Sequence, residues 1–162
     1  MSTNSNESPG EKIRATWKIL KDKPFGKILF SRGVGKLAAY TGTIKALVTE
    51  LEPGYCKAFL KERRLNKNHL KSIHAVALIN LGEMTSGLAV LSGMTNQVRG
   101  ILTKMEMEYI KKAKGDLTAE CSCEIPEVED SIDYNVKTII KDNSGETVAV
   151  GTFYWLLSRK VS

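Results

Sequence analysis

One stretch of the chain, from Ala75 to Met94, is apolar on almost every side of a helix. Small residues fill most of the other positions, and Glu83 is the only charged residue between Ala75 and Met94. A helix without a polar face is a buried helix. We therefore expect a long helix that begins after Ser72 and forms the centre of the fold. Its apolar residues recur at helical spacing: Ile73, Val76, Ala77, Leu81, Met84, Leu88 and Leu91.

A membrane-spanning helix is the alternative for this stretch, since its length suffices to cross a bilayer. Asn80 and Glu83 argue against it, because an intramembrane carboxylate is costly. The chain also has no second apolar run of this length. The sequence therefore predicts a buried core helix and no membrane partner.

Six other segments alternate apolar and polar residues with the period of a β-strand. In one of them, residues 99–111, the alternation places Ile101, Met105, Met107 and Tyr109 on one face. Turn sequences such as Pro53-Gly54 separate neighbouring segments, as in antiparallel hairpins. Two of the predicted strands precede the helix and four follow it: 43–51, 55–63, 99–111, 117–125, 132–141 and 147–157.

The N-terminal region differs from this pattern. Residues 1–10 are small and polar, so we expect a disordered tail there. Residues 11–21 and 25–40 have helical periodicity and predict a helical extension. Residues 11–162 then form a single domain of the α+β class, with one antiparallel sheet curled around the long helix.

Composition excludes several classes of function. The net charge of +6 allows an anionic partner, but no basic run is interleaved with aromatic residues, so no nucleic-acid partner is expected. Two histidines without any Cys/His spacing predict no metal site. The three cysteines form no CxxC pair, and the N-terminus has no apolar secretory segment, which favours a cytoplasmic protein.

The order of elements, together with the motif at the start of the helix, resembles the hotdog fold. Hotdog thioesterases of the phenylacetate-pathway type carry Asn or Gln, then His six residues later, then Asp or Glu nine residues after the His. Asn68, His74 and Glu83 stand at these positions here, within a segment similar to thioesterase-like bacterial proteins. The family's His-Gly-Gly is His74-Ala75-Val76 in this chain, and Gly87 stands where some relatives have Ser or Thr.

The resemblance implies hydrolysis of an acyl thioester carried by coenzyme A or by an acyl carrier, with no further cofactor. Ala75 would donate its backbone N–H to the oxyanion, Glu83 would act as general base or nucleophile, and Asn68 would orient the water or the carbonyl. His74 is either part of this site or a structural residue at the helix start. Glu83 has an alternative too, as one half of a buried ion pair with Lys or Arg.

Helix geometry places His74 and Glu83 in different sites within one chain. Nine residues rotate the two side chains to opposite sides of a helix and separate them by roughly 13 Å along its axis. Two antiparallel helices across a two-fold axis would instead bring Glu83 of one chain to the helix start of the other. We therefore expect a homodimer, or a dimer of dimers, with two composite sites.

Basic residues near the motif are candidates for binding the phosphates of coenzyme A: Arg63, Arg64, Lys67 and Arg99. Two other functions remain open. One is a non-catalytic acyl-binding protein, suggested by the missing glycines and by Gly87. The other is a hotdog hydratase or dehydratase of enoyl thioesters that uses His69 and Glu83.

Overall fold

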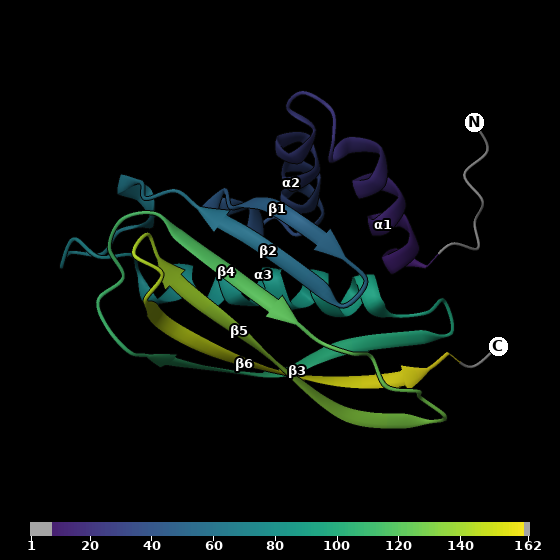
Figure 1. The fold of residues 1–162 in the computed structure, drawn as a ribbon. Coiled ribbons are helices and arrows are strands. Elements are labelled where there is room, and N and C mark those ends of the chain that lie inside the picture. Colours follow the sequence, from purple (N-terminus) through teal and green to yellow (C-terminus); the bar gives the residue numbers. More distant parts are fainter. Residues whose placement is uncertain (1–7, 161–162) are drawn as a thin grey trace.

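A six-stranded antiparallel sheet curves around one long helix in this protein, with two helices at one edge of the sheet (Figure 1). The computed structural model describes residues 8–160. This is the predicted α+β hotdog architecture, and the prediction is confirmed. In chain order the helices and strands are α1 (Pro9–Leu20), α2 (Gly26–Leu37), the 3-10 helix η1 (Thr41–Ile44), β1 (Leu47–Glu52), β2 (Tyr55–Leu60), the 3-10 helix η2 (Arg64–Asn66), α3 (Ala75–Gly93), β3 (Val98–Tyr109), β4 (Leu117–Ser122), β5 (Ser131–Asp142) and β6 (Thr147–Arg159).

The strand order in the sheet is β1-β2-β4-β5-β6-β3, so β1 and β3 form its two edges. The inner face of the sheet packs against α3. Phe153 and Leu157 of β6 and Leu81 of α3 are completely buried there. Gly82 lets α3 approach β6 closely, since a Cβ at this position would lie 2.7 Å from the Phe153 ring.

Helix α3 is long and apolar enough to cross a bilayer, yet 72% of its apolar window lies inside the protein. It is the core helix that the sequence predicts. Its first residue is Ala75, and His74 rather than Ser72 is its N-cap. The predicted start was wrong because residues 69–72 form a turn and a bend. The N–H of Ile73 then donates to the Ala113 carbonyl at 2.8 Å, outside the helix.

The first N-terminal helix begins earlier than predicted. Ser8 caps α1 with a reciprocal pair of bonds to Glu11, and Pro9 and Gly10 are already helical. The prediction of a disordered tail was therefore wrong for residues 8–10, and residues 1–7 lie outside the described part of the chain. Helix α2 and η1 then lead into β1.

The alternation predicted for β3 fails at one position. The register between β3 and β6 shifts between Leu102 and Lys104, so this edge strand contains a bulge. Leu102, Met105 and Met107 consequently face inward, whereas Ile101 lies on the outer face opposite Leu156. The alternation of apolar and polar residues in the sequence does not reveal where a bulge adds a residue.

Candidate functional site

The start of α3 carries the first part of the predicted site. His74 is exposed and precedes the helix in an extended conformation. Its ring Nδ1 accepts a hydrogen bond from the Val76 N–H at 3.1 Å. The backbone N–H of His74 donates to the Asn66 carbonyl at 2.8 Å. His74 therefore has a structural role as the cap of α3, which is one of its two predicted alternatives.

The Ala75 N–H is the free donor at this helix end. The Val76 N–H is taken by the His74 ring, and no hydrogen bond from the Ala75 N–H is formed within residues 8–160. Ala75 is exposed, and the positive end of the α3 dipole lies at this point. One backbone donor is thus available to an incoming oxygen atom.

Glu83 lies a little more than two turns beyond Ala75 along α3 and is half-buried. Burial raises the pKa of its carboxyl above the ordinary value of 4.5, and a hydrogen bond from Thr41 partly opposes this rise. Within residues 8–160 no Lys or Arg lies within ion-pair distance of Glu83. The ion-pair alternative is therefore not realised within the described chain.

Asn68 is engaged in its own loop. Its Oδ1 accepts bonds from the Leu70 N–H at 2.9 Å and from the N–H and hydroxyl of Ser72, both at 3.2 Å. These bonds hold the turn that delivers the chain to α3. Only the side-chain N–H groups of Asn68 are then left to contact a substrate or a water.

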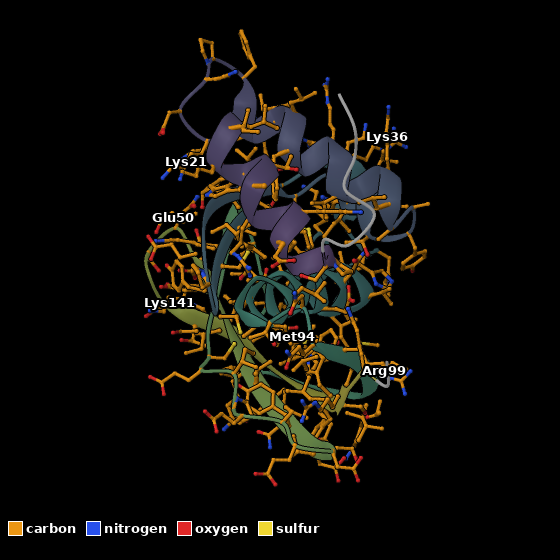
Figure 2. All side chains as sticks on the ribbon, turned by 90° about the vertical axis from the view of Figure 1, so that its right-hand side faces the viewer. Lys21, Lys36, Glu50, Met94, Arg99 and Lys141 are labelled. Carbon is orange, nitrogen blue, oxygen red and sulfur yellow. The ribbon has the colours of Figure 1, made fainter. Side chains whose placement is uncertain are left out.

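The four basic residues are not gathered at one place in the protomer. Arg63 and Arg64 are exposed beside η2, in the segment that leads to α3. Lys67 forms an ion pair with Glu62 at 2.7 Å. Arg99 lies at the start of β3, next to Gly100, which packs against Met94. Met94 follows the C-terminal end of α3, so Arg99 lies at the opposite end of this helix from Ala75 (both residues are labelled in Figure 2).

Three residues at the site escaped the sequence analysis. Thr41 of η1 lies close to the Glu83 carboxylate and lowers its pKa. Asn80, less than one turn before Glu83, donates to the Tyr40 carbonyl at 3.3 Å. The Tyr109 hydroxyl donates to the Ala75 carbonyl at 3.3 Å. Asn80 could have been found as a buried amide in an apolar helix, but no local pattern links Thr41 or Tyr109 to α3.

One face of α3 and the adjoining edge of the sheet are left uncovered by residues 8–160. Val76 is 47% exposed, and Met105 and Tyr109 on the inner face of β3 are 45% and 49% exposed. Among the described strands, β3 pairs only with β6, on its inner side in the strand order. We call this surface, formed by Val76, Ile79, Met105, Met107 and Tyr109, the open edge. Glu83 lies on the same face of α3 as Val76 and Ile79, as their spacing requires.

Comparison with known proteins agrees with this architecture. A genomics target is 24% identical with a TM-score of 0.78, over 91% of this chain and 98% of the other. A probable thioesterase from Pseudomonas aeruginosa, a protein of unknown function, is 24% identical with a TM-score of 0.74, over 80% and 94%. A hypothetical thioesterase from Streptococcus pneumoniae, solved with coenzyme A, is 19% identical with a TM-score of 0.63, over 79% and 99%.

These similarities show that the chain has the hotdog fold. Residues 26–157 match the family described as "Domain of unknown function (DUF4442)", and the chain belongs to that family. No match was found among curated protein sequences. The family covers β1 to β6, α3 and also α2, but not α1.

Proposed function

We propose that this protein hydrolyses acyl thioesters, with coenzyme A as the most suitable carrier, in composite sites of a cytoplasmic homodimer or dimer of dimers. The observation that carries the proposal is the pairing of a free backbone donor at Ala75 with the half-buried carboxylate of Glu83, which forms no ion pair within residues 8–160. The names of the hotdog proteins similar to this chain support the same class of reaction.

The two groups have complementary tasks. The Ala75 N–H would bind the thioester carbonyl and stabilise the oxyanion that forms on attack, an effect of about 3 kcal/mol for one donor in known cases. Glu83 would take the proton from the attacking water, and its raised pKa suits a base at neutral pH. Alternatively, its carboxylate would attack the carbonyl directly and expel the thiolate, which forms a mixed anhydride. Water would then hydrolyse this anhydride, which restores the Glu83 carboxylate and supplies the proton that the thiolate takes up. In both routes the thiol leaves with a proton and the acyl group leaves as a carboxylic acid.

Dimerisation would bring these groups together. Within one chain Ala75 and Glu83 are separated by roughly 12 Å along α3. A second copy placed against the open edge would cover Val76, Met105 and Tyr109 and extend the sheet through β3. Its α3 would run antiparallel to the first, so that each Glu83 faces the partner's helix start. Asn68 would contribute its side-chain N–H groups to the same site.

Coenzyme A would lie over the exposed surface near η2. Arg63 and Arg64 are exposed there and form no ion pair within residues 8–160. Lys67 is the weaker candidate, because Glu62 already binds it. In the dimer, Arg99 would reach this surface only from the partner.

The test is free-thiol release from short, medium, long and aromatic acyl-CoAs by the wild-type protein and by two variants. Glu83→Gln removes the base and keeps the shape of the side chain. Ala75→Pro removes one N–H, and proline fits the first position of a helix after an extended residue such as His74. We expect each variant to lose about a hundredfold or more in kcat.

Two matched controls accompany these variants. Glu127→Gln changes an exposed glutamate in the loop after β4, and Ala75→Gly keeps the N–H at the helix start. Both are expected to retain wild-type turnover. Equal release by wild-type and Glu83→Gln proteins would contradict the mechanism. Tight binding of acyl-CoA without any release would identify an acyl-binding protein instead.

A further inference from the structure

The N-terminal extension, residues 8–45, carries the positive charge of this protein. It contains nine Lys and Arg residues and two acidic residues, Glu11 and Asp22, a balance of +7 against +6 for the whole chain. None of its cations takes part in an ion pair within residues 8–160. Figure 2 shows Lys21 and Lys36 projecting from this end of the molecule, away from Met94 and Arg99.

The same extension exposes large apolar side chains among these cations. Phe25 is 80% exposed, Leu29 is 59% exposed and Ile28 is 41% exposed. The opposite face of α2 is occupied, since Phe30 is buried against Trp17 with their ring centroids 5.0 Å apart. The exposed apolar residues are therefore surplus to the packing of α2. They lie at the start of the helix, and Arg32 and Lys36 are exposed further along it.

Phe25 is held outward by the backbone. Its φ is 60°, a left-handed conformation that is unfavourable for a bulky residue. The adjacent Gly26 packs so closely on the Leu20 carbonyl that a Cβ there would lie 1.7 Å from the oxygen. The tight turn between α1 and α2 thus presents Phe25 at its apex, between Lys23 and Lys27.

The structure points to a lipid surface as the partner of this extension: we propose that its apex, with Lys21, Lys23, Phe25, Ile28 and Leu29, docks on an anionic membrane. Apolar side chains that enter the interface and cations that remain among the headgroups are the two components of such binding. This revises the expectation from the sequence, which weighed only a membrane-spanning helix. It does not depend on the proposed function.

A membrane fits this surface better than an acidic protein does. The apolar side chains project from a convex apex, and a protein partner would need a matching cavity, whereas a lipid interface adapts to a protruding side chain. The extension also lies at the β1 edge, with α2 bonded to β1 through Lys27 and Ser31. Docking there leaves the open edge at β3 free.

The first experiment is flotation of the wild-type protein with vesicles of phosphatidylcholine alone and of equal parts phosphatidylcholine and phosphatidylglycerol. Binding to the anionic vesicles only, and its loss in high salt, is expected, because salt screens surface charges. The double variant Lys21→Glu/Lys23→Glu should weaken the partition coefficient by about tenfold or more. Phe25→Ser should weaken it several-fold without changing the charge.

The matched control is Lys137→Glu/Lys141→Glu, which makes the same charge change at exposed positions of β5. It should bind anionic vesicles more tightly than Lys21→Glu/Lys23→Glu does. Equal weakening by both double variants would overturn the proposal, since net charge alone would then account for binding. So would failure of the wild-type protein to float with anionic vesicles. If Phe25→Ser instead lowers the mass of the particle in light scattering and vesicles capture nothing, the apex is a contact between copies.

Discussion

The two edges of the sheet differ: helices cover the β1 edge, whereas the β3 edge is left uncovered by residues 8–160. At the β1 edge, α1 and α2 cover the strand, and the Val48 N–H of β1 donates to the Ser31 hydroxyl of α2 at 2.9 Å. At the β3 edge, a strand of 12 residues lies next to exposed apolar side chains of α3 and has no partner strand within residues 8–160. A long uncovered edge strand is a template for pairing with another chain.

This contrast teaches where a second copy is required. The candidate catalytic groups lie on the side of α3 that faces the open edge, and Glu83 is only half-buried there. The C-terminal half of α3 lies beneath α1 and is buried at nearly every residue. The proposed function and the proposed dimer therefore depend on the same surface, and each can be tested through the other.

The largest effect is expected from a charge placed on the open edge. Met105→Asp would bury an unpaired carboxylate in the proposed interface, which costs about 3–5 kcal/mol and should raise the dimer dissociation constant by at least about a hundredfold. Light scattering would report the loss of mass, and thiol release should fall with it. Ile19→Asp, at an exposed position of α1, should change neither. A dimer that persists in Met105→Asp would remove the open edge as the interface.

The covered edge can be weakened through a glycine. A Cβ at Gly10 of α1 would lie 2.1 Å from the Leu91 carbonyl of α3. Gly10→Ala should therefore lower the free energy of unfolding by about 1–3 kcal/mol. Gly33 of α2 is the matched position, since a Cβ there would meet no atom of residues 8–160 within 4 Å. Gly33→Ala should raise the free energy of unfolding by about 1 kcal/mol, because alanine favours the helix. Equal effects in chemical denaturation would contradict this account of the packing.

The pH dependence of stability tests the environment of Glu83. Its raised pKa means that the folded protein binds this proton more tightly than the unfolded chain does. The protein therefore loses stability as the pH rises from the pKa of Glu83 in the unfolded chain through its higher pKa in the folded protein. Glu83→Gln should be more stable than wild type at neutral pH, and the difference should shrink below 4.5. The measurement is chemical denaturation of both proteins from acidic to neutral pH. A difference in the free energy of unfolding that does not change with pH would contradict the raised pKa of Glu83.

Much of this organisation could be predicted from the sequence. The unbroken apolar character of α3 and the six alternating segments determine the fold, because both patterns report burial directly. The site was predicted less completely. Glu83 and Ala75 were predicted from the motif that resembles hotdog thioesterases, and this motif lies at one helix. The contact of Thr41 with Glu83 and the hydrogen bonds of Asn68 Oδ1 depend instead on how other segments fold back. The bulge in β3 was missed because no residue type in this segment indicates where the pairing with β6 shifts.

Mixing two inactive variants tests the central claim, that each site combines Ala75 of one chain with Glu83 of the other. Glu83→Gln and Ala75→Pro proteins would be unfolded together in equal amounts, refolded and assayed for thiol release. Random pairing makes half of the dimers hetero, each with one intact site, so the account predicts recovery of about a quarter of wild-type activity. A mixture that stays as inactive as its two components would contradict the composite site.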